Sequence, residues 1–498
     1  MIRLFNKKTC RHIDIINFLH ANQDTISIAK LRDILNVKES VLKSDIEYLN
    51  ANYSDILRIK TTSSSTMSIH YINNSSIESF FRNIINNSAI LNMVESIFFN
   101  NFNSVDDLAS ALFTSPSTIY RMINKFNISS INKYNFKIDK KSLTFSGMED
   151  NIRSFFIQFF KEKYPFNEWP FETLNRHLIT KSIIEYFNVF NSKYEYSYLE
   201  VMAWNCAVNI YRANKHFSLL PYLNIDKINN SSTTKLLKSN ILRSAFNLFE
   251  LDFTEENIIE VFYKNVNVNF VHTFEEFTDK ANYNKAISIS LHRGFSDIYS
   301  IKNKYNLKIN NIEKLIIRVH NSAVMYNSNI KSNCILYNRY KMYIDKFSSL
   351  YPYLVNDVQI YLRNYLTTFK GIINENEVEH LTYILLSTWD SLIPQLHSKS
   401  TKLNALIISR FNSLHAYNIK NQLDLFFSYF LDTTLLENNV LQNDSIYNQK
   451  YDFIIADFIP KNKQNKKWIY IQEIPSAKNY LELTKMIAEI LDSKGFDV

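Results

Sequence analysis

The first third of the chain contains the same local pattern twice, and this repeat restricts the possible folds more than any other feature. Each copy predicts two short amphipathic helices joined by a turn of roughly three or four residues. In the first copy the helices lie within 27–50, and a β-hairpin follows with strands at 56–60 and 67–72. In the second copy the helices lie within 104–127 and the hairpin within 134–147. Two helices across so short a turn are typical of a helix-turn-helix, to which the hairpin adds the wing of a winged helix.

Capping residues and apolar spacing support these helices. Ser27 and Ser104 are predicted N-caps, and Pro116 stands at a first helical position, where its missing N–H is tolerated. Another helix is predicted over 77–100, with a break near Asn86. Residues spaced three and four apart should face the core. They are Ile28, Leu31, Ile34, Leu35, Val41, Leu42, Ile46 and Leu49 in the first copy, and Val105, Leu108, Ala109, Leu112, Ile119, Met122 and Ile123 in the second.

The second helix of each copy has an outward face suited to DNA. In a helix-turn-helix this helix lies in the major groove. Arginine reads guanine, asparagine reads adenine, and hydroxyl groups reach phosphates. The candidate contacts in the second copy are Ser117, Thr118, Tyr120, Arg121, Asn124 and Lys125, with Lys137 and Lys140 from the hairpin. Those in the first copy are Lys38, Ser40 and Lys43, on a face shared with Glu39 and Asp45.

Positive charge concentrates on the second copy. Residues 115–145 contain six basic residues and one acid, Asp139, a local charge of +5 in a chain whose net charge is +8. The corresponding face of the first copy is mixed in charge. We therefore expect the second copy to supply more of the affinity for nucleic acid. The alternative is that both units are protein-interaction or scaffold modules.

The rest of the chain predicts a helical middle and an α/β end. Residues 149–395 follow a helical pattern almost throughout, in two halves that should meet near 285–295. Apolar runs at 402–410, 451–460 and 467–475 alternate with helices, which predicts a parallel sheet. The expected fold class is therefore multidomain and mainly α, with a C-terminal α/β domain.

The expected domain organisation has five parts. The winged helix-turn-helix units occupy 1–74 and 75–148, two helical regulatory domains occupy 149–288 and 289–398, and the α/β domain occupies 399–498.

Composition argues against an enzyme and against a cofactor. The chain has four glycines, none close to another, so it lacks a glycine-rich phosphate loop and a G-x-S-x-G nucleophile elbow. The three cysteines, Cys10, Cys206 and Cys334, are too far apart for a zinc or redox motif. The start of the sequence has no signal-like apolar segment, and no run of about 18 apolar residues follows. We expect a cytoplasmic protein without a resident metal.

The order of these parts resembles the Mga-type virulence regulators of Gram-positive bacteria, the family that includes the anthrax toxin activator. The likeness is carried by KLRDILNVKESVLKSDIEYLN (30–50), DLASALFTSPSTIYRMINKFN (107–127), FSGMEDNIRSFFIQFFKEKYPF (145–166) and YDFIIADF (451–458). The third stretch is the most specific. It has Gly147, Glu149, Ile152, Arg153 and Phe155 at the family's spacing.

The resemblance implies a DNA-binding transcriptional regulator, usually an activator. It implies that the helical middle is two phosphotransferase-regulation domains, whose histidines accept phosphate from the sugar phosphotransferase system. The best matches are His216, in an Arg-x-x-x-His stretch that begins at Arg212, then His380 and His320. The implied partners are phosphocarrier proteins and promoter DNA, in which AT-rich or curved sequence would suit recognition by shape.

The resemblance also implies that the C-terminal domain is similar to a phosphotransferase IIB subunit and mediates homodimerisation. An active IIB subunit carries a cysteine in the loop after its first strand, whereas the loop here, SRFNSLHA (409–416), has none. We therefore expect an interaction domain rather than one that transfers phosphate. The alternative for the whole protein is a phosphotransferase-pathway signalling protein whose helix-turn-helix units bind protein instead of DNA.

Overall fold

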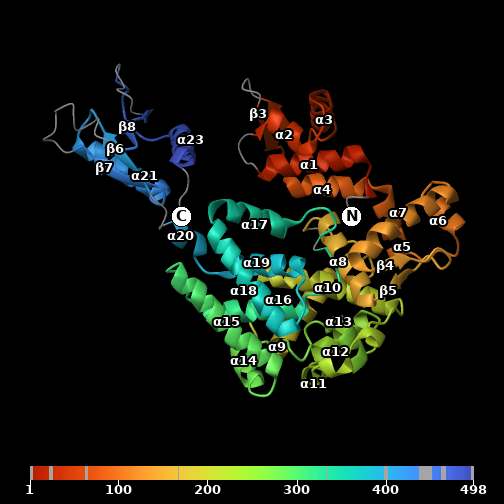
Figure 1. The fold of residues 1–498 in the computed structure, drawn as a ribbon. Helices are drawn as coiled ribbons and strands as arrows, with labels where there is room; N and C mark the ends of the chain where they lie inside the picture. The colour runs from red at the N-terminus through yellow and green to blue at the C-terminus, as the bar shows by residue number, and fades with distance from the viewer. Residues whose placement is uncertain are drawn as a thin grey trace. The chain divides into compact units, whose positions relative to one another are not determined.

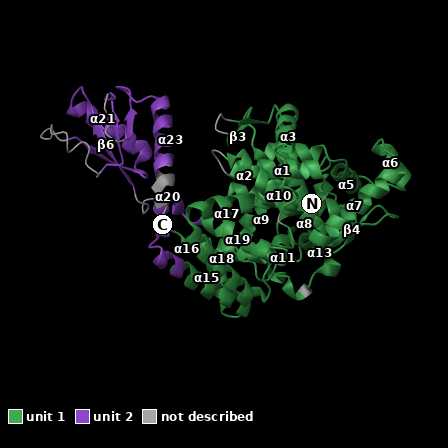
Figure 2. Ribbon diagram, turned by 45° about the horizontal axis from the view of Figure 1, so that its top comes forward, with its two compact units in different colours: residues 1–299, 311–388 green, residues 300–310, 389–498 purple. Residues whose placement is uncertain are grey.

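The computed structural model describes residues 4–21, 26–61, 66–166, 168–332, 334–397, 402–436, 451–460 and 467–494 (Figure 1). Most of them are helical, as the sequence predicts. The chain forms two compact units, one of residues 1–299 and 311–388 and the other of 300–310 and 389–498 (Figure 2). The expected domain boundary between residues 398 and 399 lies outside the described residues. No described helix is both long enough and apolar enough to cross a lipid bilayer.

The first winged unit has the predicted helix-turn-helix and hairpin. Its helices are α1 (Lys7–Ala21), α2 (Ile28–Leu35) and α3 (Glu39–Asn52), and its strands are β1 (Ile26–Ser27), β2 (Leu57–Thr61) and β3 (Thr66–Tyr71). The strands form an antiparallel sheet in the order β1-β3-β2. Ser27 caps α2, because its Oγ accepts the Lys30 N–H at 3.1 Å. Asn36 ends α2 in the left-handed conformation, so the chain turns directly into α3.

Two predictions about side chains in this unit are wrong. Ile34 is 44% exposed, because it lies to one side of the face of the short helix α2 on which Leu31 is buried. Asp45 is buried, although the sequence placed it on the outward face of α3. Its position is only slightly offset from the buried Leu42 and Leu49, and a neighbouring helix covers it.

The second winged unit repeats the arrangement. Its helices are α4 (Ile77–Asn86), α5 (Ala89–Phe99), α6 (Val105–Ala111) and α7 (Pro116–Tyr134), and its hairpin strands are β4 (Phe136–Ile138) and β5 (Phe145–Gly147). The predicted break near Asn86 separates α4 from α5. Ser104 caps α6 by accepting the Asp107 N–H at 3.1 Å. Leu112 and Met122 are half-buried rather than fully inside. Helix α7 extends beyond its predicted end because Tyr134, fully buried, continues its inner face.

The middle of the chain is helical, as expected. Its helices are α8 (Glu149–Lys163), α9 (Arg176–Val189), α10 (Tyr196–Asn214), α11 (Asn230–Leu237), α12 (Asn240–Leu248), α13 (Glu255–Phe262), α14 (Phe274–Ala281), α15 (Lys285–Lys304), α16 (Ile312–Met325), α17 (Arg339–Leu350), α18 (Pro352–Lys370) and α19 (Glu375–Thr388). The region where the two halves were expected to meet, 285–295, forms the first part of α15.

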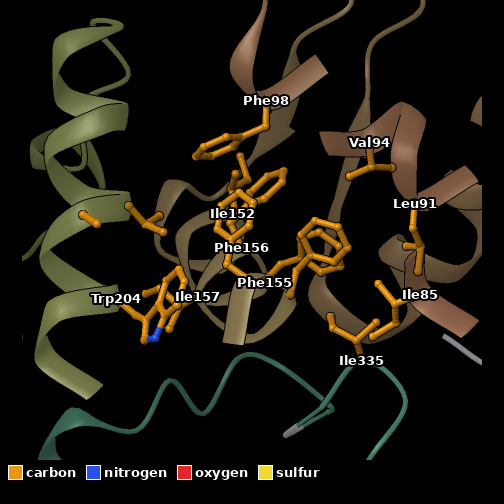
Figure 3. Close-up of a cluster of buried hydrophobic side chains, with 14 of the residues drawn as sticks. Ile85, Leu91, Val94, Phe98, Ile152, Phe155, Phe156, Ile157, Trp204 and Ile335 are labelled. Atoms are coloured by element: carbon orange, nitrogen blue, oxygen red, sulfur yellow. The ribbon is translucent and has the colours of Figure 1, made fainter. Parts of the chain in front are cut away.

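One apolar core joins the winged units to the helical middle. Helix α8 lies within it, and Phe155 and Phe156 are completely buried there (Figure 3). Phe98 of α5 packs against Phe156 with ring centroids 4.2 Å apart and stacks on Tyr211 of α10 at 5.0 Å. Because rings from α5, α8 and α10 share this core, the second winged unit cannot shift against the middle without disturbing their packing.

The second unit contains the predicted parallel sheet, with three predicted strands and one strand, β7, that the sequence analysis did not predict. Its strands are β6 (Leu403–Ile408), β7 (Leu431–Leu435), β8 (Phe453–Ala456) and β9 (Lys467–Tyr470), all parallel and ordered β7-β6-β8-β9. The unit also contains α20 (Leu392–His397), α21 (Ser413–Phe427) and α23 (Ala477–Lys494). One face of the sheet packs against α21 and α23 through an apolar cluster that includes Ile407, Leu423 and Ile487.

Candidate nucleic-acid interface and regulatory histidines

Helix α7 presents one polar face to solvent. On its inner face Ile119, Ile123 and Phe126 are fully buried and hold the helix in place. The predicted DNA contacts lie on the other face, and all are exposed apart from the half-buried Thr118: Ser117, Thr118, Tyr120, Arg121, Asn124 and Lys125. The structure therefore brings these side chains together on one accessible surface.

Hydroxyl groups organise the first turn of α7. Ser115 caps the helix by accepting the Thr118 N–H at 3.2 Å, and its Oγ lies 3.0 Å from that of Ser117. Arg121 donates from Nη2 to the Thr118 Oγ1 at 3.1 Å. An arginine and several hydroxyls thus surround the positive end of a helix, which is a favourable arrangement for a phosphate.

The second hairpin carries Lys137 and Lys140, both exposed. Asp139, the one acid of this segment, accepts the backbone N–H groups of Lys141 and Ser142 at 2.9 Å each. These hydrogen bonds lower the pKa of Asp139 and close the turn of the hairpin. Its carboxylate is therefore engaged within the turn, and lysines form the outward surface of the wing.

An asparagine clamps the wing to the preceding helix in both winged units. In the second unit Asn127 accepts the Ile138 N–H at 2.7 Å and donates to the Ile138 carbonyl at 2.9 Å. In the first unit Asn50 makes the same pair of bonds with Ile59, at 2.7 and 3.0 Å. Helix and wing are thus positioned together. Sequence reasoning missed both residues, although each lies at the same distance from the start of the second helix of its repeat.

The first winged unit offers a weaker charged surface. Lys38, Ser40 and Lys43 are exposed on or beside α3, but the Lys43 ammonium lies 2.7 Å from the Glu39 carboxylate. Asp45 points inward and binds Arg11 and His12 of α1, with 3.1 Å between His12 Nε2 and Asp45 Oδ1.

His216 lies at the surface just after α10. The residue is exposed and has left-handed backbone geometry, with φ 60°. Its neighbours contact the second winged unit. The Lys215 ammonium lies 3.4 Å from Asn101 Oδ1, and the Tyr211 hydroxyl donates to the Phe99 carbonyl at 2.7 Å. His216 is therefore accessible to a protein partner. The residues just before it contact the end of α5 and the loop between α5 and α6.

His320 is in the opposite situation. The residue is 1% exposed, and both ring nitrogens are engaged. Nε2 donates to the Asn269 carbonyl at 2.7 Å, and Nδ1 lies 2.7 Å from the Ser290 hydroxyl. Burial, reinforced by nearby lysines, lowers the pKa of His320 to about 4. Phosphorylation at this residue would require both its hydrogen bonds and its packing to open.

His380 is intermediate between these two. The half-buried ring on α19 lies between Tyr326 and Tyr340, with centroid distances of 5.7 and 4.9 Å. Burial and the charges of lysines, led by Lys161, lower the pKa of His380 to about 4. The imidazole is therefore neutral at pH 7, the form whose unprotonated nitrogen is a nucleophile.

The loop after β6, where an active IIB subunit has its cysteine, contains an internal carboxylate. Asp457, buried beyond β8, accepts the Ser409 hydroxyl at 2.7 Å and the Arg410 N–H at 3.1 Å. His415 lies 2.7 Å from Ser409 Oγ through Nδ1 and donates from Nε2 to the Glu473 carbonyl at 2.7 Å. Asp457 thus uses donors that this loop could otherwise offer to a phosphate.

The comparisons with known proteins agree on one family. The Mga helix-turn-helix domain matches residues 73–160, and the PRD domain of the M protein trans-acting positive regulator (MGA) matches residues 180–392. The chain belongs to the Mga-type regulators. These matches cover the second winged unit, most of α8 and most of the helical middle, including His216, His320 and His380. The resemblance noted in the sequence is thereby confirmed, and the protein is a transcriptional regulator.

Two relatives extend this assignment. A protein of Streptococcus pneumoniae serotype 4 named "Putative trans-acting regulator" is 25% identical over 495 residues, which are 98% of this chain and 99% of the relative. "Capsule synthesis positive regulator AcpA" of Bacillus anthracis is 24% identical over 192 residues, 38% of each chain. The alignment with the Streptococcus protein thus spans nearly the whole length of both chains, including the segments that form the first winged unit and the α/β end here.

Proposed function

We propose that this Mga-type regulator binds double-stranded promoter DNA in the cytoplasm through its winged units, chiefly the second, and activates transcription. The observation that carries the proposal is the exposed face of α7, where arginine, lysine, asparagine and hydroxyl side chains lie beside a lysine-bearing wing. An activating role is supported by the printed name of the Bacillus anthracis relative, a positive regulator.

The interface can be tested by fluorescence anisotropy with a duplex from the gene's own upstream region, titrated at several salt concentrations. We expect the Arg121→Ala/Lys125→Ala variant to bind more weakly and to show a log–log salt slope reduced by about 2, because each lost phosphate contact removes close to one unit. Lys478→Ala/Lys485→Ala is the matched control. It removes the same charge from exposed positions on α23.

Equal losses in both variants would mean that only net charge matters and would contradict a specific role for α7. Absence of DNA binding by the wild-type protein at low salt would favour the alternative, in which the winged units bind protein. Retention on heparin gives a quick separation of the two cases, because a DNA-binding face should hold until substantial salt is added.

We further propose that the helical middle is two phosphotransferase-regulation domains that receive phosphate from phosphocarrier proteins of the sugar phosphotransferase system. The phosphoryl group would pass from a carrier phosphohistidine to an unprotonated ring nitrogen of the regulator, so one P–N bond breaks as another forms. Among His216, His380 and His320, the exposure of His216 supports it as the first acceptor. The burial of His320 makes it the least accessible.

The α/β unit is the proposed homodimerisation domain, similar to a IIB subunit without its cysteine. Helix α21 exposes several large apolar side chains: Leu414, Tyr417, Leu425 and Phe426 are 73, 49, 80 and 63% exposed. Apolar side chains gathered on one element are typical of a surface that another protein covers. Self-association would sum the DNA contacts of two chains and raise the overall affinity.

A further inference from the structure

We propose that Arg212 transmits the phosphorylation state of His216 to the second winged unit by exchanging partners. In the unphosphorylated protein Arg212 holds Glu149 at the start of α8. In the phosphorylated protein it turns to the phosphoryl group on His216 and releases Glu149. The inference rests on the proposed function, because it takes His216 as a phosphoacceptor and the second winged unit as the DNA reader.

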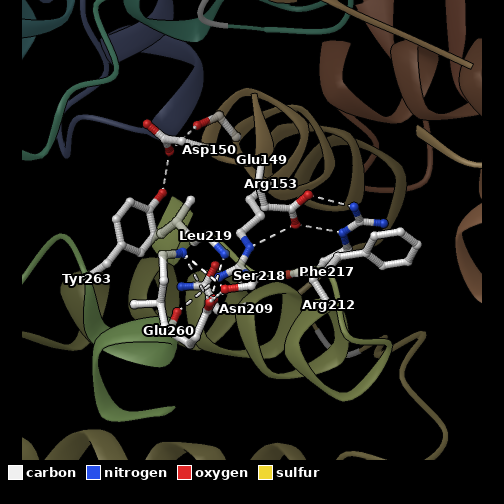
Figure 4. A network of polar contacts seen from close by, with 12 residues as sticks. Glu149, Asp150, Arg153, Asn209, Arg212, Phe217, Ser218, Leu219, Glu260 and Tyr263 are labelled. Carbon is white, nitrogen blue, oxygen red and sulfur yellow. Dashed lines mark hydrogen bonds and ion pairs between the residues drawn. The ribbon is translucent and has the colours of Figure 1, made fainter. Parts of the chain in front are cut away.

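Arg212 and Glu149 form a buried pair with two hydrogen bonds (Figure 4). Arg212 donates from Nε to Glu149 Oε1 at 2.8 Å and from Nη2 to Glu149 Oε2 at 2.7 Å. The two residues are 3% and 4% exposed. Because water is excluded and both carboxylate oxygens are used, Glu149 depends on Arg212 for much of its stabilisation.

The pair belongs to a larger network that also fixes the segment after His216. Arg153, fully buried, donates to Glu149 Oε1 at 3.0 Å, to the Phe217 carbonyl at 2.9 Å and to Glu260 Oε2 at 2.6 Å. Glu260 Oε1 accepts the Leu219 N–H at 2.7 Å. The His216 segment and the first turn of α8 are therefore joined through shared side chains.

Arg212 is the member of the network placed to change partners. It lies in the last turn of α10, shortly before His216 in the sequence, and its guanidinium stacks on the ring of Phe217, the residue after His216, at 3.8 Å. Among the described residues its Nη1 has no hydrogen-bond partner, whereas Arg153 is engaged through Nε and both terminal nitrogens. A phosphohistidine carries close to two negative charges and three acceptor oxygens, so it competes well with one carboxylate for a guanidinium.

Release of Glu149 would act directly on the second wing. Glu149 is the first residue of α8, and Gly147, two residues earlier, ends β5 and pairs with Phe136 of β4. Glu149 would keep one bond from Arg153 but lose both bonds from Arg212. The buried carboxylate would then favour a shifted α8 start, which moves β5 and the wing against α7.

Hydrogen exchange measured by mass spectrometry on the full-length protein tests the coupling without DNA. We expect His216→Glu to raise amide exchange within 145–152 at least fivefold, because the new carboxylate attracts Arg212. His177→Glu is the matched control, because His177 is also exposed and lies on α9 of the same helical region. It should leave exchange at 145–152 unchanged. If amide exchange at 145–152 is the same in His216→Glu as in His177→Glu, the inference is overturned.

Combining His216→Glu with a substitution of Arg212 shows whether the effect on exchange depends on Arg212. Arg212→Gln should by itself raise exchange at 145–152, and His216→Glu added to it should change exchange less than twofold. If His216→Glu has its full effect in the Arg212→Gln protein, the coupling does not use this residue. Arg212→Met also removes the charge and the two-point bond to Glu149 but keeps an apolar chain that can contact Phe217, and it serves if Arg212→Gln does not fold. In this variant too, adding His216→Glu should change exchange at 145–152 less than twofold.

DNA titrations with the same proteins separate this inference from the proposed function. We expect His216→Glu to change the Kd for promoter DNA at least fivefold and His177→Glu to change it less than twofold. If the wild-type protein binds DNA but His216→Glu leaves exchange at 145–152 unchanged, the proposed function stands and the coupling is contradicted. If the wild-type protein does not bind DNA but His216→Glu raises exchange at 145–152, the coupling is supported and DNA binding is contradicted.

Discussion

His320 illustrates how completely packing can determine the chemistry of one side chain. Its ring lies between Phe277 and Phe369, at centroid distances of 4.6 and 5.4 Å, and its nitrogens bond to Asn269 and Ser290. The bond to the Asn269 carbonyl requires a proton on Nε2, so Nδ1 accepts from the Ser290 hydroxyl in the neutral form. A second proton would leave two donors facing each other unless Ser290 turned. The folded protein therefore disfavours the charged ring.

The lowered pKa of His320 gives a pH prediction. The unfolded chain takes up a proton near pH 6.5, whereas the folded chain does so only near pH 4, where the pKa of His320 lies. The stabilisation from the neutral ring is therefore complete above pH 6.5 and is lost as the pH falls towards 4, a contribution of about 3 kcal/mol. In His320→Gln, the fall in unfolding free energy between pH 6.5 and 4 should be smaller than in wild type.

Urea titrations at several pH values measure this difference, and His216→Gln is the control because His216 is exposed in the folded protein. The same pH dependence in His320→Gln and wild type would show that His320 does not carry this proton linkage.

At the scale of elements, helix and wing act as one piece in each winged unit. The Asn127 clamp joins α7 to β4, and the equivalent Asn50 clamp joins α3 to β2. The second hairpin also depends on Gly147. Its φ of +151° and its close approach to Phe136 leave no room for a side chain. A wing held this tightly can present Lys137 and Lys140 at a constant distance from the residues of α7.

Gly147→Ala should therefore damage the second wing. A Cβ at this position would lie 2.7 Å from the Phe136 Cβ and 2.9 Å from its Cα, so the paired strands must separate. We expect a loss of about 1–3 kcal/mol in stability, as for other overpacked sites, together with faster amide exchange over 136–147. Thermal unfolding and hydrogen exchange measure both effects.

Ser146→Ala is the control for this change, because Ser146 is exposed on the same strand. A Gly147→Ala protein that melts and exchanges like the Ser146→Ala protein would show that the hairpin tolerates a side chain here.

At the scale of the whole molecule, the two compact units differ in kind. The first shares one apolar core between the winged units and the middle helices, and this core contains both Leu219, near His216, and Ile123 of α7. The second has its own core around a parallel sheet and exposes apolar side chains on α21. This division agrees with the proposed function, in which the first unit binds DNA and is regulated while the second brings two chains together.

The dimerisation proposal predicts a specific loss. Leu425→Glu/Phe426→Glu should weaken self-association at least tenfold, because burying two carboxylates at an apolar interface is costly. Sedimentation velocity across a range of protein concentrations measures the change. Asn421→Glu, at an exposed position on the same helix, is the control and should leave the association unchanged. Equal behaviour of the two variants would place the dimer interface elsewhere.

Strand β7 was not predicted from the amino-acid sequence, whereas both helix-turn-helix units, their wings, the helical middle and the other three strands of the parallel sheet were. These features depend on caps, turns and apolar spacing, which act between residues close together in the chain. The three-dimensional structure was needed to show that Asp45 faces inward, that His320 is enclosed while His216 is exposed, and that Glu149, Arg212 and Glu260 belong to one network. Those outcomes depend on contacts between distant segments, such as Arg153 with Glu260, 107 positions apart. Local patterns do not encode such contacts, because burial and pairing there depend on which surfaces the whole chain brings together.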